Sequence, residues 1–514
     1  MEYKFNNYYE MLISSANEHP KSIAIFDDKK KISYEELRNK VDMCAAFLQS
    51  NSISYSDKVA MIVTNSPEFI VAFLAITSIG AVAVPINTFL KKNEFEYILN
   101  DCDAKMLIVS NSHLEEILGL ERKTNLRKIA VIGEYENPND KYTSFYLYEE
   151  FSPCKINQNV SIDDISSIIY TSGTTGHPKG AIISYKNVFS NLVGINRIFT
   201  ITNKDRFIVY LPMFHSFTLT VMVLLPLFSA SAAVIVKSVF PFSNVLKQTL
   251  LKRVSVFLGV PAIYAAMAKA KIPWYFKWFN SIRYFVCGSA PLAKQTIDDF
   301  AKIFPRAQLL EGYGLSECSP LVSVNRPEHK KISSVGLPLA EYNVKIVDDE
   351  MMEKNIGEVG EIIVKGDNVM QGYLNNPGAT DDTIINGWLR TGDLGKIDED
   401  GFLYIVDRLK DLIISKGQNI YPREIEEIIY RLEEIEACAV IGIKDESEDE
   451  DVVAFVQLKD GINIEAIKIK EFLKKHLANF KIPKHIYFAD ELPKNAAGKV
   501  LKRVLKDKVK DKLG

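Results

Sequence analysis

The sequence lacks the features that would assign it to secreted, disulfide-bonded or metal-cluster proteins. Its six cysteines, at positions 44, 102, 154, 287, 318 and 438, form no CxxC pair and show no spacing typical of metal ligands. We therefore expect buried thiols in a reducing cytosol. The first residues, MEYKFNNYYEM, contain neither a basic segment nor an apolar run. A secretion signal is not expected, and a cytoplasmic protein is predicted.

An excess of charge is also absent. The chain has 62 Lys and Arg against 65 Asp and Glu, a formal net charge of −3. Such a balance supplies no overall field to hold nucleic acid, so nucleic-acid binding is not predicted. Apolar residues make up 47% and charged residues 25% of the 514 positions. This composition is typical of a globular protein, and the length predicts two or more domains.

One long run lacks charge altogether. From Phe207 to Val236 there is no Lys, Arg, Asp or Glu, which is long enough to span a bilayer. Tyr210, Pro212 and Pro226 interrupt the run, and SASAAVIV at its end is typical of a turn and a buried strand. We predict a buried helix and strand here rather than a membrane span.

Short apolar runs alternate with amphipathic stretches along the first 150 residues. KVAMIV (58–63) and AVAVPI (81–86) are predicted strands, SPEFIVAFLAITSIG (66–80) is a predicted helix, and SYEE (33–36) is a capping box that opens another helix. This alternation is typical of α/β proteins with largely parallel sheets.

Shorter strands and turns replace that alternation after about residue 335, and helices return after Asp407 to Asp411. The predicted fold class is α/β. A large N-terminal domain, residues 1–408, would hold two mostly parallel sheets flanked by helices and a small β-barrel-like part at about residues 335–407. A small mobile α+β C-terminal domain would cover residues 409–514.

YTSGTTGHPKG, residues 170–180, concentrates hydroxyls and glycines between two predicted strands. Glycines let a backbone approach a ligand closely, and N–H and hydroxyl groups donate to phosphate oxygens, so this loop predicts a phosphate cradle. The alternative is a flexible Ser/Thr/Gly hairpin. It is not a Walker A loop, because Lys179 is followed by Gly180 rather than Ser or Thr.

The loop resembles the signature of the adenylate-forming enzymes, the superfamily of acyl-CoA synthetases, peptide-synthetase adenylation domains and firefly luciferase. Further motifs of that superfamily follow in order over nearly the whole chain: LPMFHSF (211–217), GSAPL (288–292), EGYGLSE (311–317), GWLRTGD (387–393), DRLKDLIISKGQNIYPREIE (407–426) and NAAGK (495–499). Each motif is weak alone, and together they are specific.

The resemblance implies a two-step reaction and a set of site residues. A carboxylate attacks the α-phosphate of ATP, and a thiol then attacks the acyl-adenylate. The triphosphate would be held by Thr171, Ser172, Gly173, Thr174, Thr175, Gly176 and Lys179. Mg²⁺ would bind Glu317, since a hard cation prefers carboxylate oxygen. The remaining ATP or AMP contacts would be Gly288, Ser289, Ala290, Glu311, Gly312, Tyr313, Gly314, Asp393 and Arg408.

The predicted catalytic residues are Lys499, His215 and Glu317. By resemblance, Lys499 bridges the carboxylate and the phosphate, and His215 gates the carboxylate. Taken alone, Lys499 is a solvated lysine, Glu317 a surface residue and His215 a satisfied buried histidine. The C-terminal domain would turn at Lys410, and the thiol would pass Ser415, Lys416, Gly417 and Gln418.

Two departures from the family pattern stand near this site. Ser316 replaces the threonine usual before the Mg²⁺ glutamate, and Lys416 replaces a small residue. The second departure bears on the thiol step.

The residues in and around these motifs are most similar to those of long-chain and medium-chain fatty acyl-CoA synthetases. A predicted acyl pocket comprises His215, Phe214, Val260, Leu315 and Cys318. The predicted activity is a fatty acid–CoA ligase that uses ATP, Mg²⁺ and coenzyme A. An acyl carrier protein as acceptor, or another apolar carboxylic acid, stays open, and so does a non-catalytic lipid- or nucleotide-binding protein. Oligomeric state is not fixed.

The tail LKRVLKDKVKDKLG (501–514) is basic. It would meet the 3'-phosphate of coenzyme A, a carrier protein or lipid head groups at the inner face of the membrane, or it is a frayed, solvated helix.

Overall fold

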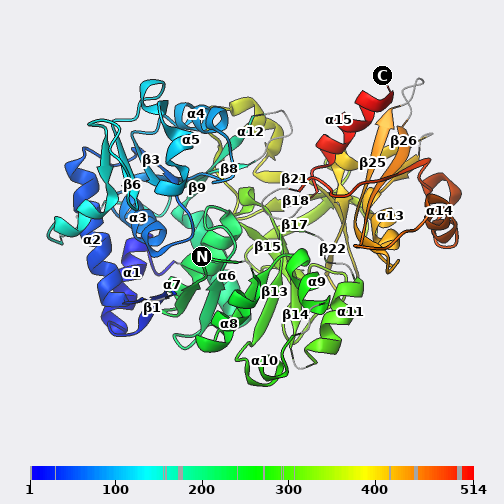
Figure 1. The fold of residues 1–514 in the computed structure, drawn as a ribbon, viewed down its shortest axis with the longest axis horizontal. Coiled ribbons are helices and arrows are strands. Elements are labelled where there is room, and N and C mark those ends of the chain that lie inside the picture. Colours follow the sequence, from blue (N-terminus) through cyan, green and yellow to red (C-terminus); the bar gives the residue numbers. More distant parts are fainter. Residues whose placement is uncertain are drawn as a thin grey trace.

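Parallel strands dominate the two large sheets of the computed structural model (Figure 1), as the α/β alternation predicts. The structure describes residues 3–28, 30–153, 156, 159–171, 177–239, 241–269, 272–290, 292, 294–305, 307–415, 418–444, 450–494 and 500–513. The predicted fold class is confirmed.

The first large sheet has eight strands. In spatial order they are β19 (Gly372–Tyr373), β9 (Lys179–Ser184), β8 (Ile165–Thr171), β4 (Val82–Pro85), β3 (Lys58–Ile62), β5 (Met106–Ser110), β6 (Lys128–Ile132) and β7 (Tyr142–Ser144). Strands β8 and β9 pair antiparallel and flank the signature loop, and β9 also pairs antiparallel with β19. Tyr373, far along the chain, therefore lies beside that loop.

The second large sheet has nine strands. In spatial order they are β16 (Leu337–Pro338), β15 (Leu321–Val324), β14 (Leu309–Gly314), β13 (Tyr284–Cys287), β12 (Val256–Gly259), β10 (Arg206–Val209), β11 (Ala232–Ile235), β1 (Ile23–Phe26) and β2 (Lys31–Ser33). From β14 to β1 every neighbouring pair is parallel. This sheet carries the GSAPL and EGYG motifs at the carboxyl ends of β13 and β14.

Alternating side chains place each sheet between two cores. Val59 and Met61 of β3 face a core shared by the two sheets, whereas Ala60 and Ile62 face a separate core on the outer side. The shared core includes helices α1 (Tyr8–Glu18), α2 (Tyr34–Ser50), α3 (Pro67–Ser78) and α6 (Tyr185–Phe199). The outer side of the first sheet is covered by α4 (Lys92–Asp101) and α5 (Leu114–Ile117).

A third core covers the outer side of the nine-stranded sheet. It joins that sheet to α8 (Ser243–Leu251), α9 (Pro261–Lys269), α10 (Trp274–Phe279) and α11 (Lys294–Ile303). These four helices lie along the lower part of the molecule in Figure 1.

The helix caps and the uncharged run adopt the structures that the sequence predicts. Ser33 caps α2 with a complete capping box to Glu36, and Ser66 caps α3. The uncharged run holds a π-helix at Thr218–Leu224, α7 (Leu225–Phe228) and β11, all within the protein core. No helix among the described residues is long and apolar enough to cross a membrane.

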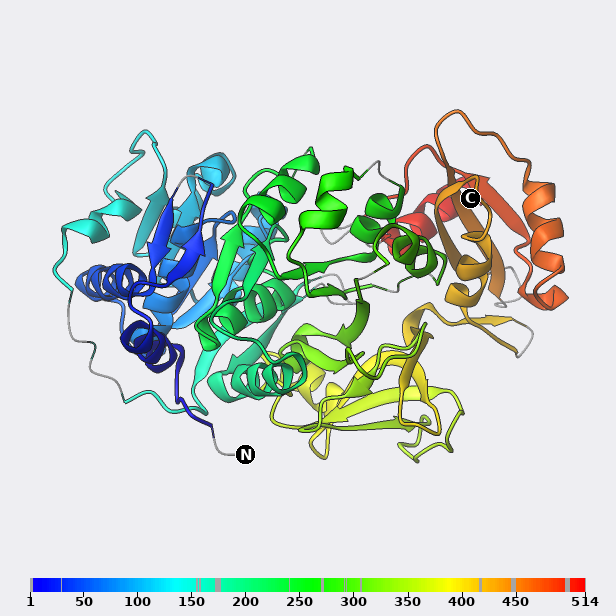
Figure 2. The same ribbon diagram turned by 90° about the horizontal axis from the view of Figure 1, so that it is seen from below.

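Antiparallel strands follow the large sheets. A five-stranded sheet contains β17 (Asn343–Val347), β18 (Gly360–Lys365), β21 (Trp388–Ile397), β20 (Ile384–Ile385) and β22 (Leu403–Arg408), with α12 (Pro377–Thr383) beside it. Figure 2 shows this sheet below the green helices, adjoining the C-terminal part.

After Arg408 the strands form small sheets of their own. These are the hairpin β23 (Ile413–Ser415) and β24 (Gln418–Ile420), and a three-stranded sheet of β25 (Ile435–Lys444), β26 (Glu450–Leu458) and β27 (His485–Phe488). Helices α13 (Pro422–Ile429), α14 (Ala466–Lys474) and α15 (Lys502–Leu513) pack around them.

Candidate active site

Tyr313, Asp393 and Arg408 come together from two sheets. The Tyr313 hydroxyl donates to Asp393 Oδ2 at 2.7 Å, and Arg408 Nε lies 3.0 Å from Asp393 Oδ1. Asp393 and Arg408 are opposite one another in the β21–β22 register. The charge of Asp393, which is only 4% exposed, raises the pKa of Arg408. Each carboxylate oxygen keeps a further lone pair, which suits it to accept a pair of sugar hydroxyls.

The glycine-rich turns beside this cluster differ in how closely neighbouring atoms approach their glycines. A Cβ on Gly314 would lie 1.9 Å from the carbonyl oxygen of Pro320, so the protein itself requires glycine there. A Cβ on Gly288 would make only ordinary contacts, with the Phe217 ring at 3.6 Å and the Gly312 carbonyl oxygen at 3.7 Å. Ser289 has a φ of +70°, which a residue with a side chain rarely adopts and which marks a candidate binding turn. Ala290 follows Ser289, and Gly312 lies opposite Val324 of β15.

Glu311 is a buried carboxyl at the base of the predicted adenine pocket. Burial raises its pKa to about 7, and the charge of Arg423 acts in the opposite direction. Its Oε1 accepts a hydrogen bond from the Leu292 backbone N–H at 3.3 Å. Arg423 belongs to α13, so the C-terminal part of the chain reaches this side of the site.

The predicted metal ligand lies beside the end of the signature strand. Glu317 Oε1 accepts hydrogen bonds from Thr171 Oγ1 at 3.3 Å and from the Tyr373 hydroxyl at 3.1 Å. Lys179 Nζ lies 5.1 Å from the centre of the Tyr373 ring. Tyr373 therefore touches two predicted site residues, although sequence reasoning missed it. Its only signal was the GY of MQGYLNNP, which carries no distinctive chemistry alone.

The donor set around Glu317 fits Mg²⁺. One carboxylate with hydroxyl oxygens nearby matches the way Mg²⁺ binds, by one or two protein carboxylates plus water and substrate phosphates. Within the described ranges, no group of three or more His, Cys, Asp or Glu gathers as a metal cage. The donors at Glu317 would suit a metal that binds together with the nucleotide.

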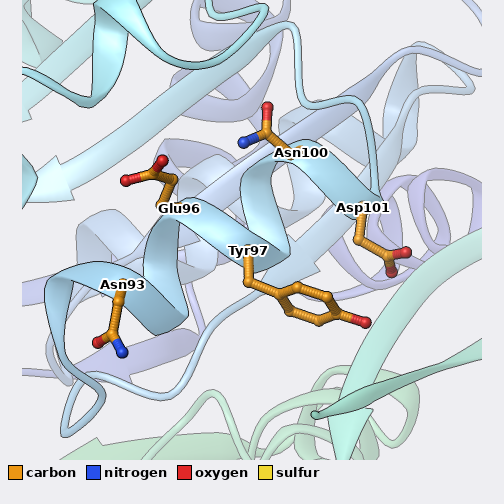
Figure 3. Close-up of a pocket in the computed structure, with 5 residues that line it drawn as sticks. All are labelled: Asn93, Glu96, Tyr97, Asn100 and Asp101. Atoms are coloured by element: carbon orange, nitrogen blue, oxygen red, sulfur yellow. The ribbon is translucent and has the colours of Figure 1, made fainter.

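Helix α4 anchors both ends of the signature loop. Tyr170 donates to Asp101 Oδ2, and Tyr97 stacks on His177 with ring centres 4.7 Å apart. Figure 3 shows Tyr97 and Asp101 on the same side of the helix. A pocket of about 550 Å³ opens here, lined by Asn93, Glu96, Tyr97, Asn100 and Asp101. Its lining includes the carboxylates of Glu96 and Asp101, which would repel phosphate.

Several predicted residues lie outside the described part of the chain. They are Ser172, Gly173, Thr174, Thr175 and Gly176 of the loop, Lys416 and Gly417 of the thiol path, and Lys499. Their predicted roles stay predictions.

The predicted acyl-pocket residues differ in their burial and in their neighbours. Phe214 turns toward Phe89, with ring centres 6.3 Å apart, and Cys318 is completely buried. Val260 precedes α9 and is 7% exposed, while Leu315 is half-buried. These side chains therefore face different surroundings.

His215 is a neutral imidazole. Its Nδ1 accepts a hydrogen bond from the Phe217 backbone N–H at 3.3 Å, which places the ring proton on Nε2. Burial lowers the pKa of His215, which is consistent with the uncharged form.

Phe217 separates the GSAPL turn from an apolar cavity of about 30 Å³. The cavity lies between α6, the π-helix and four strands of the nine-stranded sheet, and its described lining includes none of the five predicted acyl-pocket residues. The lining residues are Ile195, Phe199, Ile201, Phe207, Phe217, Val221, Leu225, Val256, Leu258, Val286, Leu321 and Val324. Sequence reasoning missed this set because such residues are indistinguishable from ordinary core.

A short 3-10 turn, Leu409–Asp411, links β22 to the C-terminal strands and contains Lys410. Ser415 and Gln418 are opposite residues of the β23–β24 hairpin. Asp407, which precedes the turn, accepts a hydrogen bond at its Oδ2 from the Arg423 backbone N–H at 2.8 Å.

The start of the basic tail is not a solvated helix. Lys502 Nζ lies 2.8 Å from Glu426 Oε1, and Leu505 is 1% exposed in a core with β25 and β26. Apolar contacts and an ion pair hold α15 against the sheet.

Two family models match the chain. The model for AMP-binding enzymes matches residues 12–374, and the model for the C-terminal domain of AMP-binding enzymes matches residues 424–499. The fold and the cluster of Tyr313, Asp393 and Arg408 agree with such a nucleotide-binding enzyme. The chain belongs to the AMP-binding, adenylate-forming family.

Named relatives narrow the class. A feruloyl-CoA synthase from an Amycolatopsis species is 34% identical over 95% of this chain and 96% of its own length. The long-chain-fatty-acid–CoA ligase FadD13 of Mycobacterium tuberculosis is 33% identical over 93% of both chains. ATP-bound MatB from Rhodopseudomonas palustris has a TM-score of 0.91 at 31% identity, with 99% of each chain covered. Within its family the chain is an AMP-forming acid–CoA ligase, and ATP and coenzyme A fit it as substrates.

Proposed function

We propose that this ligase acts on an apolar carboxylic acid, with a fatty acid as the first candidate. In the first half-reaction a carboxylate oxygen bonds to the α-phosphorus of ATP, the bond to the β-phosphate oxygen breaks, and pyrophosphate leaves. In the second, the sulfur of coenzyme A bonds to the acyl carbon, AMP leaves with the electron pair, and the thiol proton is lost to solvent. The product is an acyl-CoA.

The cluster around Asp393 carries the adenylation half of the proposal. It holds a buried carboxylate with a tyrosine and an arginine fixed on its two oxygens. A preformed arrangement of this kind needs little reorganisation when a nucleotide binds. Asp393 would accept from the ribose hydroxyls, Arg408 would contact the same sugar, and the Tyr313 ring would stack on the base.

The cluster around Glu317 positions the phosphates. Thr171 and Tyr373 fix the orientation of the carboxylate, and Lys179 adds positive charge beside it. Mg²⁺, when bound, would neutralise charge that develops on the phosphate oxygens. Lys499 would bridge the attacking carboxylate and the α-phosphate.

The thiol half requires the C-terminal part to turn. We place the hinge at Lys410, between the nucleotide contact at Arg408 and the β23–β24 hairpin, with the domain boundary at residues 408–409. Ser415, Lys416, Gly417 and Gln418 would then line the approach of the thiol, and neutral His215 would gate the acyl group.

The choice of an apolar acid is supported by the cavity behind Phe217. All the described residues that line it are apolar, and the Phe217 ring, which lines the cavity, also lies next to Gly288 of the GSAPL turn. A cavity of about 30 Å³ holds only a small group. A long acyl chain would therefore need Phe217 to move. An aromatic acid, suggested by the feruloyl-CoA synthase relative, is the second candidate.

A mass-spectrometric panel tests the proposal. Purified protein with ATP and Mg²⁺ is incubated with fatty acids of graded length and with ferulic acid, without thiol, with coenzyme A, or with acyl carrier protein. We expect acyl-CoA and AMP from at least one fatty acid. Formation of feruloyl-CoA and AMP from ferulic acid, with no acyl-CoA from any fatty acid, would overturn the fatty-acid assignment. Transfer to carrier protein alone would overturn the coenzyme A assignment in this chain.

A further inference from the structure

Four aromatic side chains of the short helix α10 face outward. Trp274 is 69%, Tyr275 47%, Trp278 66% and Phe279 67% exposed. Leu251, at the end of the neighbouring helix α8, is 63% exposed. We call these five residues the aromatic patch. Exposed apolar surface of this kind marks an interaction site far more often than chance scatter does.

One buried ring holds the helix in place. Phe276 is 1% exposed and contacts Phe304 in the outer core of the nine-stranded sheet, with ring centres 6.2 Å apart. Three of the other rings lie close together, since the Trp274 ring centre is 6.2 Å from that of Tyr275 and 6.3 Å from that of Phe279. The patch is thus a fixed feature of the surface with its rings turned outward.

The chain around the patch is strongly basic although the whole protein is not. Between Asp205 and Asp298, 92 residues contain ten Lys or Arg and no Asp or Glu. Two of these bases pair with acids from elsewhere, Lys237 with Asp27 and Arg283 with Asp205. Lys247 of α8, Arg253 and Lys277 of α10 are exposed. Lys277 lies on the same helix as the aromatic rings and Lys247 on the neighbouring helix, so positive charge lies near the patch.

We propose that the aromatic patch docks the enzyme on an anionic lipid bilayer. Trp and Tyr rings prefer the headgroup region of a membrane, where an apolar body and a polar edge are both satisfied. Lysines and arginines around them bind anionic headgroups. In Figure 1 the helix lies at the lower edge of the molecule, and the C-terminal sheets lie at the upper right, clear of a membrane on that edge.

A second copy of the chain suits the patch less well. A two-fold symmetric contact would place the same surface on both partners, so Lys247, Arg253 and Lys277 would face their own copies. Like charges across an interface oppose association. A bilayer with anionic lipid supplies the complementary charge instead.

Tryptophan fluorescence gives a direct test, because two of the three tryptophans of the chain lie in the patch. The Trp388→Phe variant leaves Trp274 and Trp278 as the only emitters. We expect its emission to shift to shorter wavelength on adding vesicles of phosphatidylcholine with phosphatidylglycerol, and to shift less with phosphatidylcholine alone. Added salt should weaken binding, since exposed charges are screened. An unchanged spectrum with the anionic vesicles would overturn the proposal.

Vesicle co-sedimentation of variants locates the surface. The double variant Trp274→Ser, Trp278→Ser should lose at least about tenfold in vesicle partitioning, and Lys247→Glu with Lys277→Glu should lose several-fold. A matched control, Met352→Ser with Ile356→Ser, removes exposed apolar side chains of the five-stranded-sheet region and should bind as the wild type does. Equal binding by all variants would place docking elsewhere and refute the patch.

Sedimentation velocity separates the competing occupant. A wild-type dimer that the Trp274→Ser, Trp278→Ser variant converts to monomer would make the patch a protein interface and overturn the membrane assignment. These readouts need no turnover, so they stand apart from the proposed activity. An unchanged melting temperature of each variant shows that the fold is intact.

Discussion

The two sides of the reaction centre are built in different ways. The nucleotide side consists of polar groups fixed by one another, with Tyr313 and Arg408 on Asp393, and Thr171 and Tyr373 on Glu317. The proposed acyl side consists of a small cavity whose described lining residues are all apolar. Directional bonds define the first side, and shape alone defines the second. We expect substitutions to abolish activity on the first and to change selectivity on the second.

The largest effect should follow from Asp393→Asn. The change keeps the shape but removes the charge that Arg408 faces and weakens the acceptor that the ribose hydroxyls would use. We expect kcat/KM for ATP to fall by about 100-fold or more in an ATP–pyrophosphate exchange assay.

The exposed Asp349→Asn serves as the control for that change. An Asp393→Asn enzyme with wild-type kcat/KM would contradict the ribose-binding role and erase the contrast between the two sides.

A second test uses the cost of burying Glu311. Its pKa is about 7 in the folded chain against an ordinary 4.5, so the folded state binds the proton more tightly. Stability should therefore be lost as pH rises from about 4.5 to about 7, by about 3 kcal/mol in full. Glu311→Gln should be the more stable protein at pH 8, and its advantage should shrink at low pH.

Denaturant unfolding at both pH values measures this difference. The exposed Glu350→Gln should show no such trend. If the wild type instead became more stable relative to Glu311→Gln as pH rises, the pKa of Glu311 would be lowered rather than raised. The charge of Arg423 would then outweigh the effect of burial.

The acyl side should respond in selectivity. Phe217→Ala joins the cavity to the site, and a pocket enlarged by a side chain shifts preference between acids by about tenfold. We expect kcat/KM to move toward longer or bulkier acids, with KM for ATP unchanged, in competition assays read by mass spectrometry.

Because Phe→Ala in a core costs about 3–5 kcal/mol, Phe217→Leu provides a milder variant with the same direction of change. Phe228→Leu lies outside the cavity lining and should leave selectivity alone. A uniform loss for all acids would mean that Phe217 supports the fold and not the pocket.

The smallest effect should come from Tyr373→Phe. It removes one donor from Glu317 but keeps the ring beside Lys179 and leaves Thr171 in place. A loss of about 1 kcal/mol, roughly fivefold in adenylation rate, is expected, with a higher Mg²⁺ requirement. Tyr404→Phe, which removes another tyrosine–carboxylate bond outside the site, should have no effect on either.

The sequence is informative about the polar nucleotide side and much less informative about the apolar acyl side. The residues proposed for the nucleotide side were named from the ordered family motifs, because a carboxylate, an arginine or a glycine alone has many uses, and their roles stay predictions. The α/β order and the caps at Ser33 and Ser66 follow from periodicity and local hydrogen bonding.

The acyl cavity could not be predicted, since Val256 or Leu321 looks like any other core residue until the strands are assembled. Sequence reasoning missed Tyr373 for a related reason. It reaches Glu317 only because β19 pairs with β9 across nearly two hundred residues of chain. The start of α15 was misjudged because Leu505 is buried against a sheet whose strands lie far from it in sequence.

The cross-strand pair of Asp393 and Arg408 has a thermodynamic consequence. Arg408 stands two residues before Lys410, so the group that meets the nucleotide is nearly continuous with the proposed hinge. If occupancy of the sugar site biases the orientation of the C-terminal part, linkage requires the reverse, and orientation must change nucleotide affinity by the same factor. Turning the C-terminal part for the thiol step would then also set how tightly AMP is held when the product is ready to leave.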